Sequence, residues 1–368
     1  MARQVILIES DQKALDEMSA ILKKSSQFNL TSTYKNANAA IGQSGIFRPD
    51  LFFIDVEDED SLKMIPAFID IFPGADVLGV MSRWNADIAH KCLKAGALGS
   101  ILRPFTEADI NEALRLYKIR GKNKPARLIS FFSPKGRAGR TTAAAVLALA
   151  LASKSGERVA LIDADLQFGD LPIFFDVEPK QTVVDATQDV KLLTPLNFEP
   201  YFHSIKTNVS LLSSPDRPEY AELVDVESLV EVVRMSGNLF RYVLIDLPAG
   251  FNPLSIGLCR LSDTIVVMAM INNGFEIQHV KRTLDMFQAY DDGKKIVHPV
   301  FTRVNPCTEE EKRKIELKLG YPVSDILPNE YKMVSIANSG RLSKGLPMDS
   351  IMMKNISRIA DDIISGKK

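Results

Sequence analysis

The sequence has few of the residues that build disulfide frameworks or metal knuckles. Its 368 residues include three cysteines and four histidines. The cysteines are odd in number and widely spaced, at Cys92, Cys259 and Cys307, which argues against both kinds of site. The histidines are scattered, so we expect no zinc site. Apolar residues make up 46% of the chain and charged residues 25%, as in an ordinary soluble globular protein.

An excess of charge of one sign is also missing. Lysine and arginine number 45 and the acids 46, so the formal net charge is −1. This balance gives no strong case for nucleic acid as a partner and none for bulk binding to an anionic membrane. No apolar stretch is long enough to span a bilayer, and the apolar run at residues 4–8 is too short for a signal peptide. We expect a cytoplasmic protein.

The pattern along the chain predicts two α/β domains, for which its length has room. Residues 1–116 alternate apolar strands with amphipathic helices, the order that builds a parallel sheet. Residues 117–126 are basic and contain glycine and proline, which is typical of a linker. Residues 127–368 form the second domain. The expected fold class is therefore α/β, with two doubly wound parallel-sheet domains.

The chain is organised around a turn at residues 133–142, between an apolar strand and an alanine-rich helix. The N–H groups of such a turn and of the first helical turn point to one place, with the helix dipole behind them. We therefore expect a phosphate site, with a chance βα turn as the alternative. The residues expected to bind a nucleotide here are Lys135, Gly136, Arg137, Ala138, Gly139, Arg140, Thr141 and Thr142.

The turn departs twice from the ordinary phosphate-loop pattern G-x-x-x-x-G-K-[ST]. Pro134 stands at the first glycine and Arg140 at the lysine. Arg140 keeps the positive charge, but its planar guanidinium is bulkier than an ammonium group and is not equivalent to it. The hydroxyl of Thr141, at the helix start, can hold a metal ion or a phosphate.

Two later segments place carboxylates at the ends of apolar strands. Asp163 and Asp165 follow the apolar run at residues 159–162, and Asp246 follows residues 242–245. The carboxyl ends of parallel strands meet at one edge of a sheet, beside the phosphate loop. We expect Asp246 to ligate Mg²⁺ directly or to accept a hydrogen bond from a water molecule bound to that ion. The three motifs together are far more specific than any one of them.

In this order the motifs resemble those of the ParA/MinD superfamily, whose phosphate loop reads K-G-G-x-G-K-T-T. The resemblance implies a P-loop NTPase of the ParA/MinD type that binds ATP and Mg²⁺. It implies that Lys135 reaches across a dimer to the partner's nucleotide and that Asp163 helps to organise the Mg²⁺ shell, as Thr141 would. Asp165 would position the attacking water, so Asp165 and Lys135 are the candidate catalytic residues. Arg137 replaces the loop's second glycine and strains it if that position needs a positive φ.

The superfamily also carries residues beside the adenine. Thr302 and Arg303 align with its Asn-Arg pair, and Asn305 is an alternative for the missing asparagine. Residues 325–329 resemble its I-P-x-D loop. The resemblance therefore implies base contacts from Arg303, Pro328 and Asn329.

The N-terminal domain resembles the flavodoxin-like receiver domain of two-component response regulators. Asp55 matches the phosphoacceptor, and the tripeptide that begins at Arg103 stands where that family has Lys-Pro-Phe. Glu9 and Ser10 replace the paired acids that hold Mg²⁺, and the loss of one carboxylate should weaken that site. Asp55 is thus a candidate phosphoacceptor. The alternative is that the domain has the shape of a receiver and serves only as an interaction module.

A receiver-like domain in front of such an ATPase resembles the TadZ/CpaE family of Flp (tight-adherence) pilus assembly. Residues 163–170, 175–179 and 209–219 also follow that branch. The resemblance implies a homodimer with bound nucleotide that marks a cell pole and recruits the pilus secretion ATPase and other polar proteins. Arg137, Arg140 and the near-neutral charge favour weak or absent hydrolysis in such a localisation factor.

Two other functions stay open. Asp165 and Lys135 would also serve an active ParA-type ATPase that partitions DNA or protein cargo, so whether the chain is an enzyme is undecided. A response regulator gated by phosphorylation of Asp55 is the other. For the final segment, residues 351–364, the acids Asp361 and Asp362 favour a packed helix over peripheral contact with a membrane.

Overall fold

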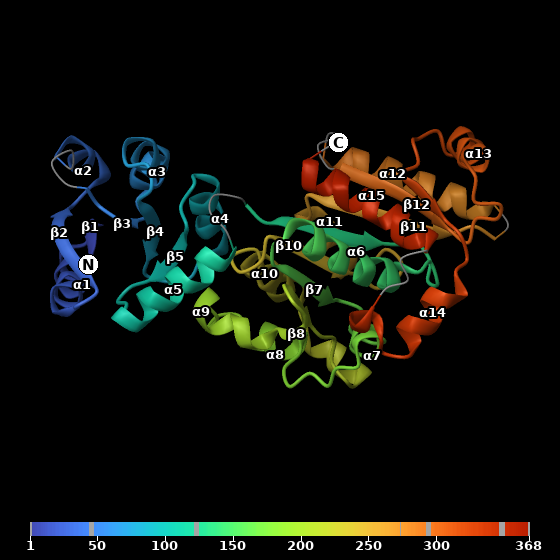
Figure 1. The fold of residues 1–368 in the computed structure, drawn as a ribbon, viewed down its shortest axis with the longest axis horizontal. Coiled ribbons are helices and arrows are strands. Elements are labelled where there is room, and N and C mark those ends of the chain that lie inside the picture. Colours follow the sequence, from blue (N-terminus) through green and yellow to red (C-terminus); the bar gives the residue numbers. More distant parts are fainter. Residues whose placement is uncertain are drawn as a thin grey trace. The chain divides into compact units, whose positions relative to one another are not determined.

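A computed structural model describes residues 2–43, 48–120, 125–272, 274–291, 296–345 and 350–366 (Figure 1). The chain divides into two compact units, one of Met1–Pro125 with Lys191–Glu199 and one of Ala126–Val190 with Pro200–Lys368. Each unit contains a sheet covered by helices, which confirms the predicted α/β class. Part of the predicted linker, residues 121–124, lies outside the described residues.

The first unit contains a parallel sheet of five strands in the order β2-β1-β3-β4-β5. Its elements are β1 Arg3–Ile8, α1 Gln12–Lys24, β2 Phe28–Tyr34, α2 Ala37–Gln43, β3 Leu51–Asp55, α3 Glu59–Ile71, β4 Asp76–Met81, α4 Ala86–Lys94, β5 Gly99–Leu102 and α5 Glu107–Arg120. Strands β3 and β4 are buried along their whole length because both faces of the sheet are covered.

The helices of this unit lie on both faces of the sheet. One core cluster joins α1 and α5 to the strands, through residues such as Met18 and Tyr117. The other joins α2, α3 and α4, through residues such as Ala40, Phe68 and Cys92. The strand order changes direction between β1 and β3, and such a point is where an open α/β sheet forms its crevice.

A short segment from later in the chain, residues 191–199, also belongs to the first unit. The sequence pattern does not indicate this. Helix α9 (Pro195–Phe198) lies against α5. Leu196 packs on the core cluster, and a carboxylate oxygen of Glu199 lies 3.0 Å from Nη2 of Arg115. Residues 191–199 are therefore structurally part of the first unit.

The second unit contains a sheet of eight strands in the order β13-β12-β11-β6-β10-β7-β9-β8, parallel except for the β8–β9 pair. Its strands are β6 Arg127–Phe132, β7 Val159–Asp163, β8 His203–Lys206, β9 Val209–Leu212, β10 Tyr242–Asp246, β11 Thr264–Met270, β12 Ile296–Thr302 and β13 Asp325–Leu327. Its main helices are α6 Arg140–Ser155, α7 Leu171–Phe175, α8 Val183–Gln188, α10 Val226–Ser236, α11 Pro253–Leu261, α12 Phe275–Asp291, α13 Glu309–Leu319, α14 Tyr331–Asn338 and α15 Ile351–Ser365.

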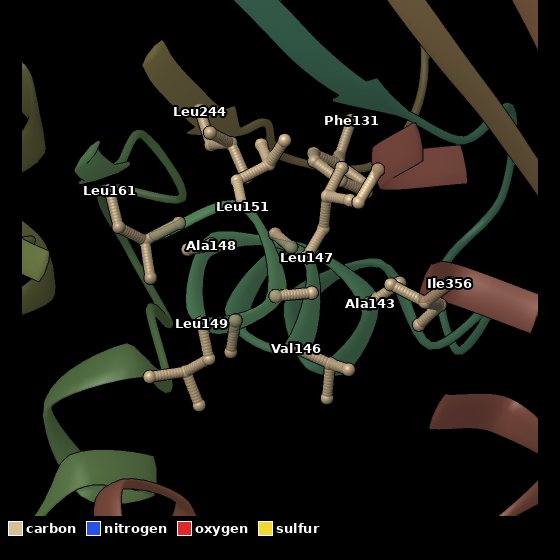
Figure 2. Packing of buried hydrophobic residues seen from close by; sticks show 14 of the residues in the cluster. Phe131, Ala143, Val146, Leu147, Ala148, Leu149, Leu151, Leu161, Leu244 and Ile356 are labelled. Atoms are coloured by element: carbon tan, nitrogen blue, oxygen red, sulfur yellow. The ribbon is translucent and has the colours of Figure 1, made fainter. Parts of the chain in front are cut away.

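Helix α6 is the centre of the second core. Its residues 143–152 are all buried, and Figure 2 shows the side chains of this helix pointing toward Phe131, Leu161, Leu244 and Ile356. A helix that is apolar on every side is expected to be surrounded by protein. It also carries the phosphate loop at its N-terminus, so the position of the loop depends on this core.

The last helix, α15, packs as a terminal helix in this core. Ile356, Ile359, Ala360 and Ile363 are buried with α6, and Asp361 lies 2.7 Å from the ammonium of Lys154. Lys367 and Lys368 lie outside the described residues. In the part of the chain that the structure describes, no helix combines the length and the apolar character that crossing a membrane would require.

The packing of Gly99 gives a prediction for the first unit. A Cβ at this position would overlap the ring of Tyr117, which is buried and donates its hydroxyl to the carbonyl of Ser100 at 2.6 Å. We expect Gly99→Ala to lower the free energy of unfolding by about 1–3 kcal/mol, because an overpacked core must shift. The matched control is Gly42→Ala in α2, where a Cβ would meet nothing within 4 Å. Thermal unfolding of both variants tests this, and equal midpoints would contradict it.

Candidate functional site

The phosphate loop lies at the carboxyl edge of the large sheet, between β6 and α6. The hydroxyl of Thr302, at the end of β12, donates to the carbonyl of Ala138 at 3.1 Å. The N–H of Gly250, just after β10, donates to the carbonyl of Ser133 at 2.9 Å. Residues from two other strands therefore hold both ends of the loop in place.

The loop contains two residues with left-handed backbone. Arg137 has a φ of 65° and Gly139, the N-cap of α6, has a φ of 77°. A non-glycine residue in this region costs of order 1 kcal/mol, so Arg137 strains the loop in the way its sequence position suggests. Lys135, Gly136 and Arg137 are exposed. These three residues, two of them cationic, are therefore accessible to a ligand or a second protein.

Two buried carboxylates lie beside the loop. Asp163 and Asp246 end the adjacent strands β7 and β10 and are partners in register. Burial raises the pKa of Asp246 to about 6, although the guanidinium of Arg140 and the hydroxyl of Thr141 favour its charged form. Burial and the charge of Asp246 raise the pKa of Asp163 as well. The site thus concentrates negative charge that it does not fully compensate.

The carboxylate of Asp163 fixes the segment that follows β7. Its Oδ2 accepts from the N–H of Leu171 and from Oγ of Ser214, both at 3.2 Å, and its Oδ1 accepts from the N–H of Asp165 at 3.3 Å. Gly169 packs so closely that a Cβ there would overlap Asp163 and Ser214. Asp163 therefore positions Asp165, and Ser214 is a polar partner that no local sequence pattern indicates.

Arg140 lies at the centre of the site. Its Nη2 is 3.8 Å from Oδ2 of Asp165 and its side chain is 8% exposed. Within the described chain, Nη1 of Arg140 and Oδ1 of Asp246 are buried without a hydrogen-bond partner. Buried polar atoms of native proteins nearly always have hydrogen-bond partners. A buried donor on Arg140 and a buried acceptor on Asp246 that both lack one therefore indicate a polar ligand at this site.

The oxygens at this site suit Mg²⁺. The hydroxyl of Thr141 is hydrogen-bonded to Asp246, and both groups are hard donors of the kind that ion prefers. The described residues hold no group of three or more acidic, histidine or cysteine side chains that could bind a metal by themselves. Mg²⁺ usually takes one or two protein oxygens together with waters and phosphates, so these residues fit an ion that arrives with a nucleotide.

The residues expected at the base follow two neighbouring strands of the same edge. Arg303, after β12, is exposed and has a φ of 56°. Pro328 is half-buried and Asn329 exposed, both directly after β13. The N–H of Val304 donates to the carbonyl of Leu327 at 3.1 Å, which ties the two segments together. Among the described residues, no hydrogen bond or ion pair joins these three residues to Asp163, Asp165 or Asp246.

A second polar cluster lies at the carboxyl edge of the small sheet. Glu9, Asp55 and Arg103, which follow or end β1, β3 and β5, meet there. Glu57 also joins the cluster, and its side chain is 2.9 Å from Arg103. Glu57 is not predicted from the sequence, although its position just after β3 could have indicated it.

The larger sheet and its site define a class of protein. A strand, a turn with exposed residues and a helix N-terminus form the anion-binding arrangement of phosphate-loop proteins. Buried aspartates at the ends of the two adjacent strands and a threonine at the helix start complete it. The second unit is thus a nucleotide-binding domain of the P-loop class.

The family can be stated from comparison with known proteins. Residues 129–343 match the CobQ/CobB/MinD/ParA nucleotide binding domain, and this match covers more than half of the chain. The chain therefore belongs to this family. The match begins in β6, so the first 128 residues of the chain lie outside it.

Curated relatives agree with the family. The septum site-determining protein MinD of Synechocystis sp. is 25% identical over 243 residues, which cover 63% of this chain and 88% of that protein. An uncharacterized ATP-binding protein of Methanocaldococcus jannaschii is 34% identical over 125 residues. That match covers 34% of this chain and 46% of the relative, so the chain spans less than half of that relative's length.

Solved structures agree with the fold. A ParA family ATPase from Chlorobium tepidum aligns with a TM-score of 0.57 at 20% identity, over 64% of this chain and 98% of that one. The septum site-determining protein MinD from Pyrococcus horikoshii, complexed with Mg-ADP, aligns with a TM-score of 0.56 at 19% identity, over 66% and 98%. At these identities the likeness concerns the fold alone.

The raised pKa of Asp246 predicts how the ligand-free protein depends on pH. The folded state holds this proton up to about pH 6, whereas the unfolded carboxyl loses it near pH 4. Stability therefore falls as the pH rises through this window. We expect Asp246→Asn to raise the free energy of unfolding above pH 6, by on the order of 3 kcal/mol, with the gain vanishing toward pH 4.

Chemical denaturation of both proteins at several pH values, without nucleotide or Mg²⁺, measures this difference. The result that contradicts it is a variant less stable than the wild type at pH 7.5. That would mean that Arg140 and Thr141 stabilise the charged carboxylate more than burial destabilises it.

Proposed function

We propose that the chain is an ATP-binding localisation factor of Flp (tight-adherence) pilus assembly. In this proposal it forms a homodimer with nucleotide and recruits the secretion ATPase and other proteins to a cell pole from the cytoplasm. Hydrolysis is weak or absent. Residues 1–116 serve as a receiver-like domain and 127–368 as the ATPase-type domain, and the connection through residues 117–126 begins with the end of α5, where Tyr117 still packs in the first unit. The contact of Arg140 with Asp165 carries the part of the proposal that concerns hydrolysis.

We expect the site to bind ATP with Mg²⁺. The loop from Lys135 to Thr142 would surround the phosphates, and the unpaired Nη1 of Arg140 would donate to them. Thr141 and Asp246 would hold Mg²⁺, which neutralises phosphate charge, while Asp163 keeps the neighbouring segment in place. The Mg-ADP complex of the Pyrococcus horikoshii protein supports this choice. Arg303, Pro328 and Asn329 would contact the base.

Slow hydrolysis follows from the position of Arg140. Phosphoryl transfer depends mostly on positioning and on neutralising charge, and Asp165 is the residue proposed to position the attacking water. Its carboxylate faces the guanidinium at 3.8 Å. A carboxylate that is paired with a cation is a weaker acceptor for a water proton. The chain thus retains the groups that bind nucleotide while the group proposed for hydrolysis is engaged elsewhere.

The dimer and the pilus role rest on different features. Lys135 and Arg137 are exposed on the loop, where a second chain could be reached. A cationic loop suits a neighbour that brings more phosphate charge, as a second nucleotide would. The pilus role rests on the order of a receiver-like unit and a domain of this family, together with the resemblance of residues 163–170 and 209–219 to the TadZ/CpaE family.

The first experiment is the mass of the protein in solution without nucleotide, with ADP and with ATP plus Mg²⁺, with phosphate release assayed on the same samples. We expect a dimer with ATP and turnover near background. Lys135→Ala should lose the dimer. The matched control is Lys206→Ala at the end of β8, which is exposed and lies at the amino edge of the sheet.

Two results would overturn the proposal. Absence of ATP binding would mean that the loop does not function. Rapid turnover that Asp165→Ala abolishes would favour an active ATPase that partitions cargo.

Replacing Arg140 separates binding from hydrolysis. Arg140→Lys keeps the positive charge but presents it as a compact ammonium without the second nitrogen of the fork. We expect ATP still to bind and kcat to rise at least about tenfold, because Asp165 is released. Adding Asp165→Asn should remove that gain. If Arg140→Lys binds ATP and its kcat equals that of the wild type, the ion pair does not limit turnover.

A further inference from the structure

Three carboxylates and one guanidinium meet at the carboxyl edge of the small sheet. Nη1 of Arg103 lies 2.5 Å from Oε2 of Glu9 and 3.6 Å from Oδ1 of Asp55. Its Nη2 lies 2.9 Å from Oε2 of Glu57. Glu9 is fully buried, Asp55 is 2% exposed, and the side chain of Arg103 is 15% exposed. We call Glu9, Asp55, Glu57 and Arg103 the acidic pocket.

Every carboxylate oxygen of this pocket has a partner. Besides the contacts with Arg103, Oε1 of Glu9 accepts from the N–H of Asp11 at 3.0 Å. In Asp55, Oδ1 accepts from the N–H of Glu57 at 3.0 Å and Oδ2 from the hydroxyl of Ser10 at 2.6 Å. Oε1 of Glu57 accepts from the hydroxyl of Ser82 at 2.7 Å. An incoming metal ion or phosphoryl group would have to break one of these contacts.

The electrostatics of the pocket depend on Arg103. Burial raises the pKa of Glu9, and the charge of Asp55 adds to this, whereas Arg103 and the N–H of Asp11 oppose it. Burial would lower the pKa of Arg103, but Glu9, Asp55 and Glu57 outweigh it and raise the pKa. The planar guanidinium of Arg103 interacts with three carboxylates at once, so its charged form is favoured overall. For Glu9, burial raises the pKa by more than the single guanidinium and the N–H of Asp11 lower it.

We propose that Arg103 is the permanent counter-ion of the acidic pocket. It occupies the place that a divalent cation would need, and its two terminal nitrogens link the segments after β1 and β3. The pocket therefore binds no Mg²⁺, and Asp55 accepts no phosphoryl group from a small donor. The first unit then acts as a fixed module and not as a phosphorylation switch. This inference is independent of the function proposed for the second unit.

The chain carries a suitable probe for this pocket. Trp84, its single tryptophan, lies two residues after Ser82, the donor to Glu57. Tb³⁺ takes hard oxygen ligands as Mg²⁺ and Ca²⁺ do. Excitation of the tryptophan alone sensitises Tb³⁺ emission when the ion binds near it. The full chain is titrated with Tb³⁺ without nucleotide, and bound Tb³⁺ is then displaced with Mg²⁺.

We expect no saturable emission from the wild type. Arg103→Gln should gain a saturable signal, with affinity at least about tenfold higher than that of the wild type, because three carboxylates are left without their cation. Mg²⁺ should compete with Tb³⁺ and raise the thermal midpoint of this variant. The matched control is Arg48→Gln, an exposed arginine just before β3 at the opposite edge of the sheet, which should behave as the wild type.

A saturable Tb³⁺ signal in the wild type that Mg²⁺ displaces would overturn the proposal, as would a folded Arg103→Gln that gains no signal. If Arg103→Gln does not fold, the wild-type titration decides alone. A second measurement uses radiolabelled acetyl phosphate. The wild type should incorporate no more label than Asp55→Asn, and label above that level would contradict the inference.

Discussion

The constraint on which both units depend is the crowding of carboxylates at the carboxyl edge of a parallel sheet. Parallel strands end side by side, so acids that follow them are brought together and buried at the same time. Asp163 and Asp246 meet in this way in the large sheet, and Glu9 and Asp55 in the small one. Buried charges without partners are very costly, so each edge needs positive charge or hydrogen-bond donors.

The two edges meet this need to different degrees. In the small sheet, Arg103 and nearby hydroxyl and N–H groups reach every carboxylate oxygen of the pocket. In the large sheet, Asp163 is held by donors, but Oδ1 of Asp246 is buried without a partner in the part of the chain that the structure describes. The first edge is complete without a ligand. At the second edge, Nη1 of Arg140 is also without a partner among the described residues, which is why we propose that a nucleotide with Mg²⁺ completes it.

Sequence patterns could predict the strands, the loop and the acids, because each depends on residues that are close in the chain. An apolar run followed by Asp163 or Asp246 implies a strand that ends at the edge of a sheet. The partners of those acids depend on tertiary structure and could not be predicted. Ser214 reaches Asp163 across 51 residues, and Thr302 bonds the loop at Ala138 across 164. The return of residues 191–199 to the first unit has the same cause, since Leu196 carries no local signal of where it packs.

Both edges carry an arginine where the families they resemble carry a lysine, and the surroundings decide what it does. A guanidinium has five donors in a rigid plane, so its role depends on how many acceptors lie within reach. Arg103 has three carboxylates around it and binds two of them at 2.5 and 2.9 Å, which leaves it no freedom to serve a ligand. Arg140 has one carboxylate at 3.8 Å and a buried Nη1 with no partner among the described residues. An acceptor-rich anion such as a phosphate would satisfy that remaining nitrogen. The same residue type is therefore the counter-ion of a carboxylate cluster in one unit and the proposed phosphate-binding group in the other.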